Sequence, residues 1–369
     1  MKKEHIVIWT LFLFLMFVFC VEMTSRWLYK DVTLEAGRKS VEVLLGNADI
    51  YNYSSFTPHP YMLYENTPLY TNSYQQINSL GYRGHEISET PDKKTIRILT
   101  LGGSTTFDGG VENPAKTWTA QLEGIFNHKG YKVETINGGI NAATSAEMLS
   151  HYMFKYRYLS PDVVIVNLGW NDTAPLYFKD YDPTYSKFRR WGGLSIASRV
   201  GEKEILQYSY FLRIIYAWWL GNPKLSDLIL LPAEWNTVKP SMIMQNVKHN
   251  EPIGFERNLG VLLQTIITDG AKPVLFIEPI ATADIFKTYH DDWVKSAFSA
   301  MEIAYEKDKA VVRKMSKKYH VFLIEMPKSS IPISDFVDHA HVNEAGAALK
   351  ANFIYQNLPK NYLRKKYAS

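Results

Sequence analysis

The sequence predicts an α/β fold, in which helices cover both faces of a parallel sheet, and three observations support this prediction. Five short apolar runs rich in β-branched residues recur along the chain. Helical patterns separate most of these runs, which is typical of buried parallel strands. Two of the helical patterns end in glycine, the residue that most often follows a last helical turn. The runs are residues 95–102, 131–138, 162–169, 272–279 and 320–326.

The first element along the chain, residues 1–30, has the pattern of a signal anchor. Two lysines precede an uncharged apolar run, Ile6–Val21. Sixteen helical residues span about 24 Å, somewhat less than a hydrocarbon core of roughly 30 Å. No small-residue cleavage pattern follows, and Phe19 is too large for a lipoprotein site at Cys20. We therefore expect a single-pass membrane helix with the rest of the chain outside the cytoplasm; secretion after signal cleavage is the alternative.

The next segment, residues 31–92, is predicted to be a helical and irregular extension. Its first part, residues 31–48, has a helical pattern, and the remainder is rich in Tyr, Asn, Pro and Ser. The main domain is predicted over residues 93–369, with an insertion at about 180–245 between the third and fourth strands. This insertion contains an apolar segment, residues 208–235, which we expect to be a packed helix; a lid and a membrane-facing element are the alternatives.

Composition and charge exclude several classes of function. The chain of 369 residues is 46% hydrophobic, which is enough for a sizeable core. Its net charge of +4 comes without a long basic run or a nucleic-acid motif, so we expect no nucleic-acid partner. Its single cysteine excludes an intramolecular disulfide and a cysteine metal site, and the histidines lack HExxH spacing. We therefore expect neither a metal nor a cofactor.

Small and polar residues follow four of the predicted strands. Because ligands of parallel α/β sheets bind beyond the carboxyl ends of the strands, these residues are expected to meet at one edge. "GGSTT" brings Ser104 after the first strand, and "NGGIN" brings Gly139 after the second. "GWND" brings Asn171 after the third strand, and "DHAH", with Asp338 and His341, follows the fifth.

Together these residues supply the groups that acyl transfer requires. Ser104 is the candidate nucleophile, and His341 is the candidate base because imidazole titrates near neutral pH. Asp338, three residues earlier, is placed to orient the imidazole. The backbone N–H groups of Ser104 and Gly139 and the side-chain amide of Asn171 are candidate donors to an oxyanion.

Three further residues near these blocks have more than one interpretation. His339 is a rival to His341, but Asp-x-x-His spacing favours His341 and makes His339 a solvated neighbour. Trp170 is either a core residue or a platform for substrate. Asp108, close to Ser104, is a candidate for shaping the pocket.

The four blocks, in this order, resemble those of the SGNH (GDSL-type) hydrolases. The resemblance covers roughly residues 80–358. It implies a flavodoxin-like three-layer αβα sandwich with a five-stranded parallel sheet, and metal-free serine esterase, lipase or acyltransferase chemistry. By position, it implies that Ser104 is the nucleophile and that Gly139 and Asn171 are oxyanion donors. It also implies that Asp338 and His341 complete the triad.

The sequence departs from the family pattern at two points. Gly103 stands where the familiar G-D-S motif has aspartate, so any role of that aspartate is absent. The glycine block offers both Gly138 and Gly139, and we select Gly139 as the donor.

The sequence thus predicts a membrane-anchored, extracytoplasmic serine esterase that forms an acyl-enzyme on Ser104. We expect O-acetyl groups of an envelope glycan as substrate, because aromatic residues suit sugar stacking and the family often acts on such esters. One alternative is an O-acyltransferase that works with a membrane partner delivering acyl groups. The others are a lipid-directed esterase with an interfacial lid at residues 211–220, and a non-catalytic envelope scaffold.

Overall fold

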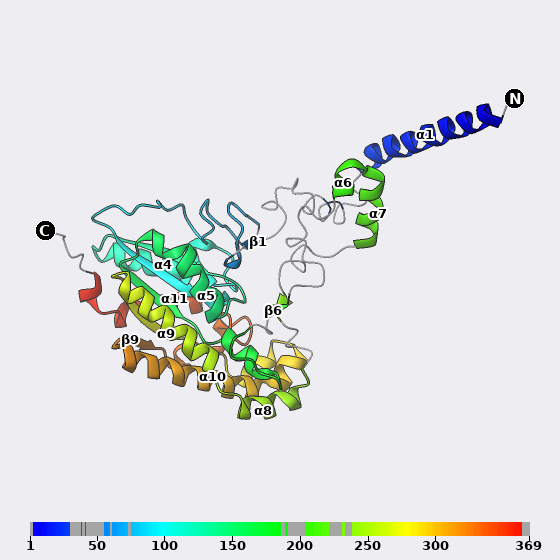
Figure 1. Cartoon of the computed structure of the whole chain (residues 1–369). Helices are drawn as coiled ribbons and strands as arrows, with labels where there is room; N and C mark the ends of the chain where they lie inside the picture. Colours follow the sequence, from blue (N-terminus) through cyan, green and yellow to red (C-terminus); the bar gives the residue numbers. More distant parts are fainter. Residues whose placement is uncertain are drawn as a thin grey trace. The chain divides into compact units, whose positions relative to one another are not determined.

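We describe the protein from a computed structural model, shown in Figure 1. Its chain forms two compact units, which are described separately. The N-terminal unit comprises residues 1–58 and 190–231, and the sheet unit comprises residues 59–189 and 232–369. The structure describes residues 3–29, 38, 41, 55–59, 61–72, 75–185, 189–190, 204–220, 231–232 and 238–363.

The sheet unit is built on five parallel strands in the order β4-β3-β5-β8-β9. Each strand falls within or overlaps one of the five predicted runs, and the order is that of flavodoxin-like doubly wound sheets. The predicted fold class is therefore confirmed. The strands are β3 (Ile96–Gly102), β4 (Val133–Gly139), β5 (Val163–Asn167), β8 (Lys272–Ile277) and β9 (Phe322–Glu325).

Helices cover both faces of this sheet, as its apolar strands require. Every residue of β3 and β5 is buried, so neither face can meet water. Ile98 and Ile165 belong to one core cluster with Leu122 of α4 and Ala351 of α11. Side chains alternate along a strand, so Leu99 faces the other layer, where α5, α9 and α10 pack together. These helices are α4 (Trp118–His128), α5 (Ser145–Phe154), α9 (Ile253–Thr268), α10 (Asp292–Tyr319) and α11 (Glu344–Asn357).

The two helices that the sequence predicts to end in glycine do so in the structure. Gly130 follows α4 with φ of 84°, and Gly270 follows α9 with φ of 83°. Both therefore have the left-handed backbone that favours glycine at this position. The remaining helices and strands are α1 (Lys3–Leu28), β1 (Phe56–His59), β2 (Leu63–Asn66), α3 (Ser104–Phe107), β6 (Arg189–Arg190), α6 (Glu204–Tyr208), α7 (Tyr210–Leu220), β7 (Leu231–Pro232) and α8 (Pro240–His249).

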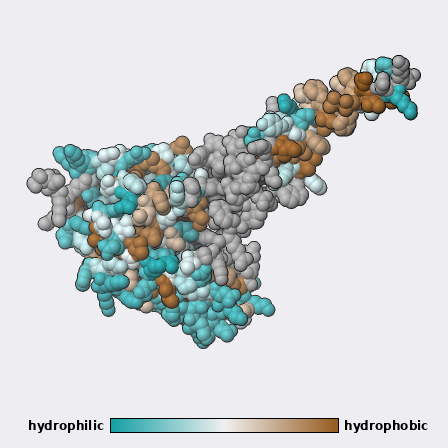
Figure 2. All heavy atoms as spheres, in the orientation of Figure 1, coloured by the Kyte–Doolittle hydropathy of each residue, from teal (hydrophilic) through white to brown (hydrophobic). Residues whose placement is uncertain are grey.

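The N-terminal segment forms the expected apolar helix, α1. Residues His5–Leu28 are long and apolar enough to cross a membrane, and none of the most apolar part is buried in the protein. Figure 2 shows hydrophobic surface along this helix and more hydrophilic residues at its N-terminal end. Of the helix predicted over residues 31–48, all but positions 38 and 41 lies outside the described residues.

The compact units differ from the predicted division at two places, the start of the main domain and the insertion. Compact packing of the sheet unit begins at His59, not at residue 93. Within the predicted insertion, residues 190–231 belong to the N-terminal unit, whereas α8 packs against α10 of the sheet unit. The physical reason for the first difference lies in polar contacts to the sheet edge. Tyr64 donates to the carbonyl of Asn141 at 2.9 Å, and Asn66 donates to that of Gly139 at 3.1 Å.

Candidate active site

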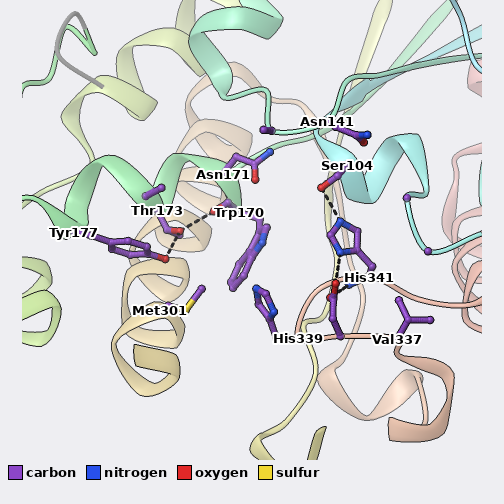
Figure 3. Close-up of a pocket in the computed structure, with 15 residues that line it drawn as sticks. Ser104, Asn141, Trp170, Asn171, Thr173, Tyr177, Met301, Val337, His339 and His341 are labelled. Atoms are coloured by element: carbon purple, nitrogen blue, oxygen red, sulfur yellow. Dashed lines mark hydrogen bonds and ion pairs between the residues drawn. The ribbon is translucent and has the colours of Figure 1, made fainter. Parts of the chain in front are cut away.

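A pocket of about 520 Å³ lies at the carboxyl edge of the sheet (Figure 3). It collects residues from all four predicted blocks: Ser104, Asn141, Asn171, and Asp338 with His341. Ser104 opens α3 directly after β3, and Asn171 begins a 3₁₀ turn that follows β5. The structure therefore brings together residues that are up to 237 positions apart in the sequence.

Ser104, His341 and Asp338 form a continuous hydrogen-bonded chain. The Oγ atom of Ser104 lies 2.7 Å from Nε2 of His341, and Nδ1 of His341 lies 2.7 Å from Oδ2 of Asp338. A carboxylate can only accept, so this contact assigns the imidazole proton to Nδ1 and leaves Nε2 as the acceptor for the serine hydroxyl. The arrangement is that of a serine nucleophile with its base and orienting acid.

The loop around Asp338 holds its carboxylate in the charged form. Its Oδ1 atom accepts hydrogen bonds from the backbone N–H groups of Ala340 and His341, each at 2.7 Å. Burial would by itself raise the pKa of Asp338, but the hydrogen bond and charge of His341 and these two N–H groups hold that pKa below its ordinary value. Asp338 is therefore negative at neutral pH and can stabilise an imidazolium.

The side-chain amide of Asn171 is fixed at the edge of the pocket. Its Nδ2 atom donates to the carbonyl of Ala143 at 2.8 Å, and the amide nitrogen carries a second hydrogen. Figure 3 shows the amide on the same side of the pocket as Ser104. The backbone N–H of Ser104, at the start of α3, has no acceptor among the described residues. Both donors are therefore available near the serine hydroxyl.

Gly139 does not contribute to the pocket as predicted. Its backbone N–H donates to Oδ1 of Asn137 at 3.0 Å, and it does not line the cavity. A Cβ at this position would lie 2.2 Å from the backbone nitrogen of Phe107, so glycine is needed where β4 approaches the turn after Ser104.

The turn after β4 lines the pocket in place of Gly139. Asn141 and Ala142 both contact the cavity, and Ala142 has φ of 61°. Left-handed backbone is uncommon for alanine, which is why a search for a glycine missed this position. The nearest sequence signal was the run of small residues that follows "NGGIN".

Aromatic and apolar side chains form the wall opposite the turn. Trp170 lines the pocket and also packs edge-to-face on Tyr305, with ring centroids 5.3 Å apart. His339 lines it too, 5.6 Å from the Trp170 ring and 6.0 Å from Tyr289. Burial lowers the pKa of His339 although Asp338 opposes this effect. His339 is thus a half-buried, neutral wall residue, not a solvated neighbour.

Buried polar residues hold the loops around the pocket in place. Asp172 accepts from the backbone N–H of Ser145 at 3.0 Å and from its hydroxyl at 2.5 Å, and from the hydroxyl of Tyr185 at 2.9 Å. Burial raises the pKa of Asp172 to about 7. Asp108, which follows α3, accepts from the N–H of Trp118 at 2.6 Å, and burial raises its pKa to about 6. Asp108 therefore links the turn after Ser104 to the start of α4 and does not line the pocket.

Arg83 is a supporting residue that sequence reasoning missed. Its guanidinium is buried and donates to the carbonyls of Phe107 at 2.9 Å and Asp108 at 2.8 Å, and also to that of Val111. It also lies over the Phe107 ring, 4.6 Å from the centroid. Arg83 thus binds three carbonyls of the segment that follows Ser104. Contacts to backbone carbonyls leave no pattern in the sequence, so no motif indicated them.

Within the described ranges, no group of three or more His, Cys, Asp or Glu side chains could hold a metal ion. The pocket itself is lined by the hydroxyl of Ser104, the imidazole of His341, the carboxylate of Asp338 and the amide of Asn171.

Several solved structures align with most of this chain at low sequence identity. A GDSL-like lipase from Bacteroides thetaiotaomicron aligns with 74% of this chain and 93% of its own, at 14% identity and a TM-score of 0.41. A lipase/acylhydrolase from Enterococcus faecalis aligns with 74% and 100%, at 14% identity and a TM-score of 0.42. A catalytic mutant of an acetylxylan esterase from Geobacillus stearothermophilus aligns with 73% and 97%, at 12% identity and a TM-score of 0.42. No family model and no curated protein matches the chain.

Proposed function

We propose that this protein is an SGNH-type serine esterase that cleaves acyl esters through an acyl-enzyme on Ser104. The observation that carries the proposal is the chain of two 2.7 Å contacts from Ser104 through His341 to Asp338. Nucleophilic catalysis by serine requires a base that takes the hydroxyl proton and an acid that orients this base, and His341 and Asp338 are in position for these roles.

In the acylation step, Oγ of Ser104 attacks the ester carbonyl while Nε2 of His341 takes its proton. The negative charge on the carbonyl oxygen is stabilised by the N–H of Ser104 and the amide of Asn171. The bond to the alcohol then breaks, and His341 returns the proton to the alcohol oxygen. Asp338 stabilises the imidazolium that exists between these events.

In the deacylation step, water takes the place of the alcohol. His341 removes a proton from this water as the oxygen attacks the acyl carbonyl, and the released Ser104 oxygen recovers the proton. The products are a carboxylic acid and the free enzyme. If a sugar hydroxyl replaces water, the same steps give O-acyl transfer.

We infer that the substrate is an O-acetylated glycan of the cell envelope. The aromatic side of the pocket, with Trp170 and His339, supports a ring-shaped alcohol, because aromatic faces stack on sugars. The volume of about 520 Å³ is in the range of small-molecule sites. The apolar α1 supports a membrane-anchored enzyme with the pocket outside the cytoplasm.

The proposal is tested by measuring the rates at which the full chain, in detergent, hydrolyses different ester substrates. Acetyl release from a chemically acetylated oligosaccharide should be efficient, and p-nitrophenyl acetate should be preferred to the twelve-carbon ester. Ser104→Ala should abolish both reactions, whereas Ser299→Ala, at an exposed serine of α10, should leave them unchanged. Preference for the long ester, with activation by micelles, would indicate a lipid-directed esterase instead. Transfer of the acetyl group to added sugar in place of water would indicate an acyltransferase.

A further inference from the structure

Glu22, near the end of the apolar helix α1, contacts the start of α7. Ile6–Val21 contains no charged residue, and the charged residues Glu22 and Arg26 come directly after it. At 1.5 Å per residue, the uncharged part covers about 24 Å of a hydrocarbon core of roughly 30 Å. When α1 crosses a bilayer, Glu22 therefore lies close to the boundary between acyl chains and headgroups.

The carboxylate of Glu22 caps the first turn of α7. It accepts from the backbone N–H of Tyr210 at 2.6 Å and that of Phe211 at 3.3 Å, and from the hydroxyl of Ser209 at 2.9 Å. A negative group at the beginning of a helix satisfies N–H groups that lack a partner within the helix and interacts favourably with the helix dipole. Arg26 lies over the Tyr210 ring, 5.2 Å from its centroid. These contacts place the start of α7 at the same level as Glu22.

One face of α7 is packed against the end of α1. Tyr29 is buried and meets Tyr210 edge-to-face, with centroids 5.4 Å apart. The guanidinium of Arg213 is 4.3 Å from the Tyr210 centroid and 5.8 Å from that of Tyr29. Ala217 is buried in the same cluster. Arg213, the charged residue of α7, is thus turned inward and kept off its outer face.

The other face of α7 and its neighbour α6 exposes large apolar and aromatic side chains. Phe211, Ile215 and Trp218 of α7 are spaced by three or four residues, so they lie on one face of that helix, and Tyr208 is exposed at the end of α6. Tyr208 and Trp218 are 76% and 75% exposed. An outer helix face of this kind in water is unusual, whereas Trp and Tyr are enriched where acyl chains meet headgroups. Figure 2 shows hydrophobic surface at the positions of α6 and α7 in Figure 1 as well as along α1.

We propose that α6 and α7 form an interfacial helix pair that lies on the extracytoplasmic surface of the bilayer, held there by Glu22 of α1. The apolar face binds the boundary between acyl chains and headgroups, in continuity with the membrane-crossing surface of α1. It follows that α1 is retained in the mature protein. Signal cleavage would remove Glu22, which caps α7, and would separate the Tyr29 ring near Arg213 from the membrane-crossing helix.

The proposal is tested with the full chain in phosphatidylcholine vesicles. In a Cys20→Ser background, an environment-sensitive fluorophore is attached at Ile215→Cys or Trp218→Cys, with Ser299→Cys of the sheet unit as the control. Emission at positions 215 and 218 should shift to the blue and be quenched at least threefold more by lipids with a nitroxide near the headgroup than by lipids with one near the chain end. If the emission at positions 215 and 218 had the same wavelength as that of the water-exposed control at position 299, the proposal would be overturned. A blue shift of the emission without quenching by either lipid would also overturn the proposal, because it would indicate that the fluorophore is covered by protein.

The role of Glu22 is tested in the same vesicles. Glu22→Ala should weaken the quenching at position 215 at least twofold, whereas Glu22→Gln, which keeps an acceptor oxygen, should retain most of it. Equal quenching in both variants and in the parent would overturn the capping step. Turnover of p-nitrophenyl acetate is recorded on the same samples. The pocket belongs to the sheet unit, so the two proposals are tested independently. If the esterase proposal is wrong, the parent protein will show no turnover, but the quenching will be unaffected.

Discussion

Gly103 leaves room that the side chain of Asn171 occupies. A Cβ on Gly103 would lie 2.2 Å from Nδ2 of Asn171, far inside contact distance. The residue immediately before Ser104 therefore limits where the candidate oxyanion donor can lie. This explains why glycine, and not the aspartate of the G-D-S pattern, suits this chain. The site depends on this close approach as well as on the triad.

We predict that Gly103→Ala lowers kcat/KM for p-nitrophenyl acetate by about 10²- to 10³-fold, as loss of one oxyanion donor does. The added methyl group displaces the Asn171 amide from its contact with the Ala143 carbonyl. The control is Gly124→Ala in α4, where a Cβ would meet nothing within 4 Å. That variant should keep full activity and gain about 0.5–1 kcal/mol of stability. Equal activity of the two variants would contradict the role given to Asn171.

Asp338→Asn should lower kcat by about 10³- to 10⁴-fold with little change in KM. The amide cannot stabilise the imidazolium, and its NH₂ group opposes the Nδ1–H tautomer of His341. Steady-state kinetics on p-nitrophenyl acetate measure the effect. Asp335→Asn, three residues earlier and outside the pocket, is the matched control. A kcat for Asp338→Asn within tenfold of the parent would remove Asp338 from the mechanism.

Replacement of Arg83 tests whether the segment before the first sheet strand supports the site. Arg83→Met should lower the free energy of unfolding by about 2–4 kcal/mol, because three buried carbonyls lose their donor. Urea unfolding measures this change. Lys132→Met, at an exposed lysine paired with Asp92, should leave stability unchanged. A neutral effect of Arg83→Met would show that residues 59–92 contribute little to the site.

Trp170→Ala should raise KM for an acetylated oligosaccharide about tenfold, a cost comparable to that of one aromatic contact. KM for p-nitrophenyl acetate should change much less if Trp170 contacts the sugar and not the acyl group. Trp170→Phe should recover part of the loss, because it keeps a ring against Tyr305. Tyr158→Ala, at an aromatic residue that is 71% exposed, is the control. Equal increases in KM for both substrates would indicate general disruption of the pocket.

The buried Asp172 should make stability fall as pH rises. Its pKa in the folded protein is about 7, above the value of about 3.9 for aspartate in an unfolded chain. Between these values the folded state binds more protons than the unfolded state, so the free energy of unfolding decreases with increasing pH. The melting temperature of Asp172→Asn minus that of the parent should therefore increase from pH 4 to pH 7.

The control for this prediction is Asp284→Asn on the surface. A hydrogen bond from Lys287 lowers the pKa of Asp284, so its effect has the opposite sign: stability from the charged form is lost as pH falls. The difference in melting temperature for Asp284→Asn should not increase with pH. A difference for Asp172→Asn that stays constant from pH 4 to pH 7 would contradict the raised pKa.

The sheet and the triad were predictable because local patterns determine them. A strand buried on both faces must be continuously apolar, as Ile96–Gly102 is, and the order of the polar blocks follows the order of the strands. Asp-x-x-His spacing brings the Asp338 carboxylate to Nδ1 of His341 within a single loop. Each strand and the Asp338–His341 pair depend on residues that are close in sequence, whereas the approach of His341 to Ser104 follows from the order of the strands.

The remaining parts of the site depend on backbone geometry and distant contacts. The glycine block predicts a donor at Gly139, but the N–H of Gly139 is bound to Asn137, and the left-handed residue that lines the pocket is Ala142. Arg83 contacts carbonyls of a segment 24 or more residues later, and carbonyls are present at every residue. His339 has no motif that distinguishes a pocket wall from a solvated loop. Such features follow from the assembled fold and not from residue types.

The most direct test of the central claim is the reaction of the full chain, in detergent, with a fluorophosphonate, followed by mass spectrometry of the modified peptide. We predict one adduct, on Oγ of Ser104, in the parent protein and in Ser299→Ala. The adduct should be absent from Ser104→Ala and formed at least 10³-fold more slowly in His341→Ala. No adduct in folded protein, or equal rates in the parent and His341→Ala, would contradict an activated serine at this site.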